Sequence, residues 1–85
     1  TMNVQVFDTH VSTTQGQYLH FDVLVTPEQS GNAKHYAQLF LQQQGIDSTG
    51  IEQQSCAFCH NEIATPEVTE AISRQGYYIL KLQGC

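Results

Sequence analysis

The alternation of hydrophobic and polar residues predicts a β-hairpin at the start of the chain. Residues 17–25 alternate between an apolar face and a face that carries polar groups. Residues 3–11 alternate in a similar way. The short segment between them contains Gly16, which suits the left-handed position of a three-residue loop. We therefore expect residues 3–11 and 17–25 to pair as adjacent antiparallel strands.

Parity restricts the register of this hairpin. A slip by one residue would set the apolar face of one strand beside the polar face of the other. A three-residue loop places His10 opposite His20, and in the same register Asp8 lies opposite Asp22. A loop shifted by one residue would place His10 opposite Asp22 instead. In both registers these four side chains share one face of the sheet.

Two helices are predicted after the hairpin. From about residue 29 to 44, apolar side chains recur at three- and four-residue spacing, and Gly45 is a natural C-terminal stop. The second helix is marked at both ends, because Thr65 can cap it, Pro66 suits its first position and Gly76 can end it. Each helix has one apolar side, which we expect to pack against the sheet.

Two further strands complete the predicted fold. Residues 51–58 predict a third strand, and residues 77–83 predict a last strand whose two apolar faces favour a central position. The resulting order is ββαβαβ, an α/β fold that borders on α+β. Because crossover connections join parallel strands, we expect a mixed four-stranded sheet with two packed helices and its last three strands parallel. The carboxyl ends of the third and fourth strands would then meet at one edge of the sheet.

Composition limits the classes of function. The 85 residues suffice for one domain, residues 1–85. Three Lys and Arg residues against eight Asp and Glu residues give a formal net charge of −5. This is too few cations to neutralise a nucleic-acid backbone or to bind an anionic membrane. No apolar run approaches the ~20 residues of a membrane span. We expect a small soluble domain that binds neither nucleic acid nor membrane.

The first residues and the cysteines suggest a compartment. Thr1 precedes Met2, and if Met2 is the native first residue, no leader has been removed. We then expect a cytoplasmic protein whose three cysteines are thiols. An odd number of cysteines cannot form a complete set of disulfides within one chain. The fold must therefore rest on its hydrophobic core.

The segment 55–62 carries the most distinctive pattern. Cys56 and Cys59 have the spacing of a thiolate pair, and His60 adds an imidazole. If the third and fourth strands end at one edge of the sheet, Cys85 joins them. The four side chains would then form a Cys₃His set, which suits tetrahedral Zn²⁺. The adjacent positions of Cys59 and His60 are awkward for two ligands of one ion.

Other interpretations of the CxxC pair stay open. A thiol-redox pair normally lies at a helix N-terminus, where the dipole favours the thiolate, but the predicted helix begins only near Thr65. The run from Cys56 to His60 also matches the pattern for covalent haem attachment, a chemistry that normally follows export from the cytoplasm. Cysteines in a strand are, finally, ordinary small core residues.

The polar face of the hairpin is a second candidate site, formed by Asp8, His10, His20 and Asp22. A carboxylate next to an imidazole favours its protonated form and supports general acid–base chemistry. Two histidines and two aspartates could instead hold a divalent metal ion. The simplest alternative is a solvated face with cross-strand His–Asp pairs.

Several short segments, taken together, resemble a known family. They are Phe7-Asp8-Thr9, His20-Phe21-Asp22, Cys56-Ala57-Phe58-Cys59-His60, Gly76-Tyr77-Tyr78-Ile79 and Gly84-Cys85. The chain resembles an uncharacterised family of short bacterial proteins, a domain-of-unknown-function family, over nearly its whole length. The resemblance implies a compact bacterial α/β domain and groups the three cysteines with His60. It implies no activity, substrate or catalytic residue.

The sequence thus favours a small non-enzymatic binding or interaction module of unknown partner. Its most specific form has a zinc site at Cys56, Cys59, His60 and Cys85. The first alternative is a thiol-redox protein that uses the CxxC pair. The second is an enzyme that uses the hairpin face for acid–base chemistry.

Overall fold

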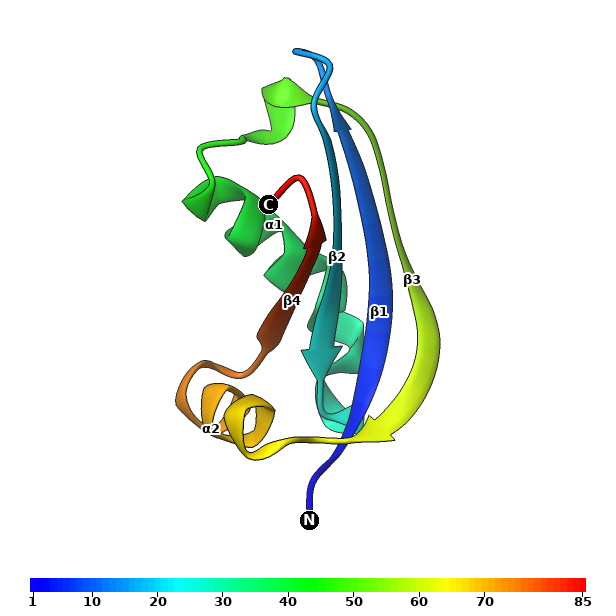
Figure 1. Cartoon of the computed structure of the whole chain (residues 1–85), viewed down its shortest axis with the longest axis vertical. Coiled ribbons are helices and arrows are strands. Elements are labelled where there is room, and N and C mark those ends of the chain that lie inside the picture. Colours follow the sequence, from blue (N-terminus) through cyan, green and yellow to red (C-terminus); the bar gives the residue numbers. More distant parts are fainter.

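The chain folds into four strands and two α-helices, and the computed structural model describes all of residues 1–85 (Figure 1). The order ββαβαβ is confirmed. None of the helices is long and apolar enough to cross a membrane. In chain order the elements are β1 (Asn3–Thr13), β2 (Tyr18–Val25), the 3₁₀ segment η1 (Pro27–Asn32), α1 (Ala33–Gln43), the 3₁₀ segment η2 (Ser48–Gly50), β3 (Ile51–Ile63), α2 (Pro66–Gln75) and β4 (Tyr78–Gln83).

The hairpin has the register that a three-residue loop predicts. His10 pairs with His20, and Asp8 pairs with Asp22. The third strand is longer than expected, because β3 continues past residue 58 and ends at Ile63. These pairings place the four polar residues of the hairpin on one face of the sheet.

The two helices differ in how well local sequence marks their ends. The Thr65 hydroxyl accepts a hydrogen bond from the N–H of Val68 (3.2 Å), and Gly76 ends α2 in the left-handed conformation with φ of 96°. The predicted boundaries of α2 are confirmed. The helix α1 begins later than expected, at Ala33, because the preceding residues form the tighter η1 segment.

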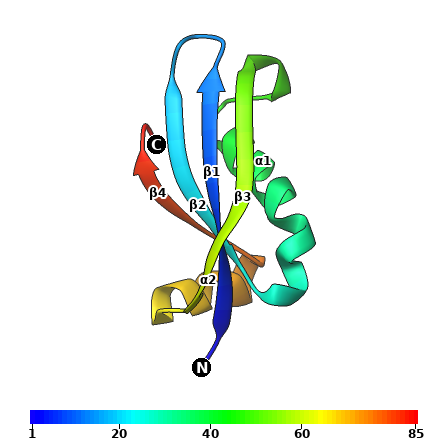
Figure 2. The same cartoon turned by 90° about the vertical axis from the view of Figure 1, so that its right-hand side faces the viewer.

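The sheet has the strand order β3-β1-β2-β4, and every neighbouring pair is antiparallel (Figure 2). The expectation of a mixed sheet with its last three strands parallel was wrong. Strands β2 and β3 do run in the same direction, but β1 lies between them. The connection through α1 carries the chain past β2 to the free edge of β1.

The position of α2 explains the direction of β4. Strands β3 and β4 are the two edges of the sheet, and α2 joins them at the end where β3 stops (Figure 1). A helix of 10 residues is about 15 Å long, close to the roughly 14 Å of three strand spacings. This connection therefore takes the chain sideways and not back along the sheet. The carboxyl ends of β3 and β4 do not meet at one edge, contrary to the expectation.

Strand β4 lies at an edge, and the expectation of a central position was wrong. Its first residues are nonetheless covered on both sides, because Ile79 packs against the core under α1 and Tyr78 packs against the core under α2. Further along the strand, Leu80 and Leu82 are 41% and 50% exposed. The strand β4 is thus apolar on both faces because a helix packs on each face, although only β2 lies beside it in the sheet.

The two faces of the sheet are covered differently. Odd-numbered residues of the hairpin, such as Val11 and Phe21, pack against Phe40 of α1 in the larger core cluster. Even-numbered residues, such as Val4 and Leu24, pack against α2 in a smaller cluster at one end of the opposite face. The rest of that opposite face has no helix over it, and we call it the open face. Its hairpin residues are Asp8, His10, Ser12, Tyr18, His20 and Asp22.

Candidate functional site

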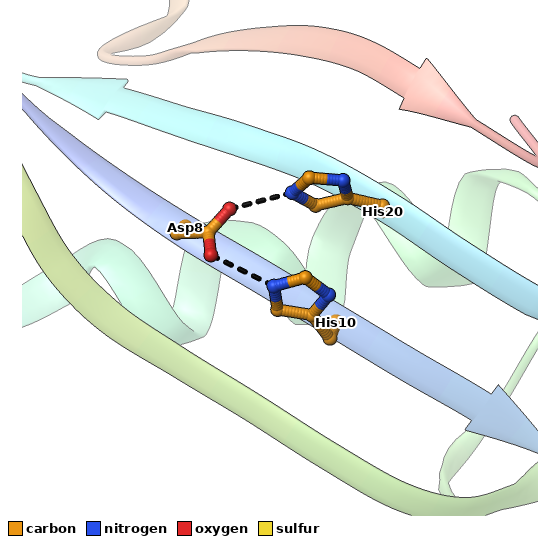
Figure 3. A group of neighbouring side chains, drawn as sticks. All are labelled: Asp8, His10 and His20. Carbon is orange, nitrogen blue, oxygen red and sulfur yellow. Dashed lines mark hydrogen bonds and ion pairs between the residues drawn. The ribbon is translucent and has the colours of Figure 1, made fainter.

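Three side chains of the open face form one hydrogen-bonded cluster (Figure 3). Asp8 and His10 are two residues apart in β1 and therefore point to the same side of the sheet. His20 comes from β2, directly opposite His10. In Figure 3 the helix α1 lies behind the sheet, and the three side chains are seen in front of it. The cluster therefore joins the two central strands on the side away from α1.

The carboxylate of Asp8 is the centre of this cluster. One oxygen, Oδ1, accepts a hydrogen bond from Nε2 of His20 (2.6 Å), and the other, Oδ2, accepts one from Nε2 of His10 (2.7 Å). The two imidazole rings stack with centroids 4.2 Å apart and an angle of 12° between their planes. All three side chains are partly exposed, between 27% and 39%. Both rings are therefore held in a fixed orientation and stay accessible from solution.

Tyr18 extends the cluster by one more hydrogen bond. It lies two residues before His20 in β2, on the same face, and its hydroxyl bonds to Nδ1 of His10. When the imidazole of His10 is neutral and Nε2 donates to Asp8, Nδ1 accepts a hydrogen bond from the hydroxyl of Tyr18. The result is an unbroken chain from Tyr18 through His10 and Asp8 to His20. Tyr18 was not among the residues expected from the sequence, although its even position in the strand places it on this face.

The two aspartates of the hairpin have opposite electrostatics. Hydrogen bonds from His20 and His10, together with any positive charge on those rings, lower the pKa of Asp8 below its ordinary value. Burial raises the pKa of Asp22, and the negative charge of Asp8 raises it further, against a weaker opposing effect of His20 and His60. Asp8 therefore loses its proton more readily than an ordinary aspartate, and the neighbouring Asp22 loses its proton less readily.

The same three side chains have donor atoms that could ligate a metal. One donor atom from each of Asp8, His10 and His20 lies within 4.8 Å of the others. In a tetrahedral zinc site, bonds of about 2.1 Å place the donors roughly 3.4 Å apart, with each lone pair aimed at the ion. Here both Nε2 atoms bond to the two oxygens of Asp8, so in this arrangement the three side chains form a hydrogen-bonded cluster.

Comparisons with known proteins agree with the family resemblance seen in the sequence. The model of a family described as domain of unknown function DUF2024 matches residues 2–82. The chain belongs to this family. A similar solved structure is the NMR structure of protein NE1680 from the bacterium Nitrosomonas europaea, a structural genomics target. Its sequence is 37% identical, the match covers 99% of each chain, and the TM-score is 0.80. A search of curated proteins found no match.

The structure does not bring the candidate Cys₃His set of this DUF2024 chain together. Cys56, Cys59 and His60 belong to the edge strand β3, whereas Cys85 follows β4 at the opposite edge. The sulfur of Cys85 lies 4.0 Å from the backbone oxygen of His20. All three cysteines are free. The set depended on β3 and β4 ending at one edge, and their antiparallel directions separate its members.

The two thiols of the CxxC pair have different surroundings within β3. Cys56 is half-buried against the core under α1, and its sulfur accepts a hydrogen bond from the Thr9 hydroxyl (3.5 Å). Cys59 is exposed at a β-bulge, and the neighbouring His60 ring lies 3.3 Å from the carboxylate of Glu62. Because α2 begins only after β3 has ended, neither thiol lies at a helix N-terminus that would favour a thiolate.

A shallow hollow of about 230 Å³ adjoins the cluster. It lies over the neighbouring strands β1 and β3, where Ser55 of β3 pairs with His10 of β1. Every lining residue carries a polar group, and none is a carboxylate, lysine or arginine. The lining residues are His10, Ser12, Tyr18, Gln53, Gln54 and Ser55.

The three permanent cations of the chain lie away from the open face. Lys81 projects over the Phe40 ring on the α1 side, with its nitrogen 5.9 Å from the ring centroid. Arg74 pairs with Glu70 along α2, and Lys34 belongs to α1. The ionisable side chains that contact His10 are Asp8, His20 and Tyr18, with no lysine or arginine among them.

Proposed function

We propose that the open face is a general acid–base site, in which His10 takes a proton from a bound polar molecule and later returns it. The observation that carries this proposal is the unbroken hydrogen-bond chain from Tyr18 through His10 to Asp8. A general base needs a lone pair that can reach the substrate and a partner that stabilises its protonated form. In His10, Nδ1 supplies the lone pair when the bound molecule displaces the Tyr18 hydroxyl from it, and Asp8 is the partner of the N–H on Nε2.

His20 has the role of a positioning residue in this proposal. Its Nε2 donates to the oxygen of Asp8 that His10 does not use. This second hydrogen bond favours the ionised form of Asp8 and keeps its carboxylate in the plane that His10 requires. Asp8 is then ready to stabilise the imidazolium that forms when His10 accepts a proton.

The ring opening of 5-nitrobenzisoxazole tests the base directly. A base removes one carbon-bound proton from this compound, and the product is a coloured phenolate, so no nucleophile is needed. We expect the intact protein to exceed free imidazole at equal concentration, because Asp8 stabilises the imidazolium that forms on His10. His10→Ala should lower the rate at least tenfold, since general-base catalysis contributes about 10²–10⁴-fold.

His35→Ala is the matched control for this experiment. His35 is an exposed histidine of α1, which packs on the other face of the sheet, so its removal should leave the rate unchanged. Asp8→Asn should lower the rate without removing the imidazole. If His10→Ala folds and retains the full rate, the cluster only joins β1 to β2. The non-enzymatic binding module expected from the sequence would then be the better description.

A further inference from the structure

We infer that Tyr18 is a nucleophile that accepts an acyl group from a neutral carboxylic ester, which makes the open face an acyl-transfer site. This inference rests on the proposed function, because it uses His10 as the base. Nucleophilic catalysis requires a hydroxyl within hydrogen-bond reach of a base, and a third group that orients the base. Tyr18, His10 and Asp8 occupy these three roles in a row.

Tyr18 is accessible to a reactant. The residue is 39% exposed to solvent, and it borders the hollow described above. The β3 wall of this hollow carries the Ser55 hydroxyl and the Gln53 side-chain amide, in strand positions opposite His10 and Ser12. These groups are hydrogen-bond donors that can bind the carbonyl oxygen of an ester while negative charge develops on it.

Charge decides between an acyl donor and a phosphoryl donor. Phosphoryl transfer depends on cations that neutralise the phosphate oxygens, and the three Lys and Arg side chains of the chain lie elsewhere. Ionised Asp8 and the net charge of −5 repel an anionic donor. A neutral ester needs no cation. The hollow of about 230 Å³ is smaller than a typical small-molecule site, so the acyl group should be short.

The proposed reaction has two balanced steps. The phenol oxygen of Tyr18 attacks the ester carbonyl carbon while Nδ1 of His10 takes the phenol proton. The carbon–oxygen bond to the alcohol then breaks, and the alcohol leaves with the proton from His10. In the second step His10 takes a proton from water, which attacks the acyl carbon and releases a carboxylic acid, and the proton returns to Tyr18. A phenol leaves the acyl carbon more readily than an aliphatic alcohol does, because the aromatic ring delocalises the negative charge of the phenolate.

The experiment uses p-nitrophenyl acetate with the intact protein. We expect a burst of p-nitrophenolate, one acetyl group added to the protein by mass spectrometry, and peptide mapping that locates it on Tyr18. Tyr18→Phe should lower the burst rate at least tenfold and remove the adduct. It should retain proton abstraction from 5-nitrobenzisoxazole, because Nδ1 of His10 then has no hydroxyl bonded to it. His10→Ala should lose both reactions.

Tyr78→Phe is the matched control. Tyr78 has a phenol hydrogen-bonded to the carboxylate of Glu67 (3.1 Å) but no imidazole partner, so its removal should leave the burst unchanged. Acetyl groups found only on cysteines or lysines would overturn the inference, as would a full burst in folded Tyr18→Phe. In both cases an intact ring-opening activity would leave the proposed base in place. If the unmodified chain shows neither the burst nor the ring opening, both proposals are overturned.

Discussion

Asp8 and Asp22 face each other across the central strands, yet their carboxyl groups behave differently. The pKa of Asp8 is lowered because two histidine N–H groups bond to it, whereas burial raises the pKa of Asp22. The difference does not come from residue type or from strand position. It arises because both imidazole rings bond to Asp8, whereas Asp22 is more deeply buried and also lies beside the negative charge of Asp8.

We expect Asp22→Asn to stabilise the protein at pH 7. A raised pKa in the folded state means that the ionised carboxylate is less favourable there than in the unfolded chain. Removing the ionisable group removes this cost, so Tm should rise by roughly 3 °C, the shift that about 0.5 kcal/mol gives in a domain of this size.

The gain in stability of Asp22→Asn should depend on pH. The gain should shrink as pH falls through the raised pKa of Asp22 and vanish below the ordinary value of 3.8, where the carboxyl is protonated in both states. Thermal unfolding followed by circular dichroism at several pH values measures this. Glu52→Gln, which neutralises an exposed carboxylate on β3, is the control. A lower Tm for Asp22→Asn at pH 7 would contradict the prediction.

At the scale of elements, local signals account for both ends of α2 but not for the start of α1 or the end of β3. The ends of α2 depend on Thr65 and Gly76, which act within their own turns. The side chain of Asn32 makes no capping hydrogen bond at the start of α1, so nothing local separates this helix from η1. Strand β3 is almost fully exposed at the sheet edge, and an edge strand without a buried side has little alternation to detect.

Thr65→Ala should destabilise the protein by about 1 kcal/mol, because the N–H of Val68 then loses its side-chain acceptor. Urea unfolding measures the change in the free energy of unfolding. Ser73→Ala, at an exposed position inside α2, is the control and should change it by less than about 0.5 kcal/mol. Equal losses in the two variants would show that the cap contributes nothing specific.

At the scale of the whole molecule, two separate cores lie on opposite faces of one sheet. The cluster under α1 contains Val11 and Leu19, and the cluster under α2 contains Val6 and Ile72. Because α2 reaches only one end of its face, the polar residues beyond it stay open to solvent. The candidate site therefore lies beyond the end of α2, on a sheet whose other face packs against α1.

This division predicts additive effects on stability. Val11→Ala should cost about 2 kcal/mol and Ile72→Val about 1 kcal/mol. Because the two residues belong to different clusters, the double variant should lose the sum within about 0.5 kcal/mol. Urea unfolding of the single and double variants forms the cycle. Val11→Ala combined with Leu19→Val, its neighbour in the same cluster, should deviate more. Coupling of equal size in both cycles would contradict two independent cores.

The sequence by itself determined the features that depend on short-range periodicity. Strand alternation has a period of two, so parity alone placed Asp8, His10, His20 and Asp22 on one face, and the pairing of β1 with β2 confirms it. The caps of α2 are likewise local. The directions and neighbours of β3 and β4 were decided only by the tertiary structure, because they depend on how α1 and α2 cross the sheet. That is why the cysteines did not come together.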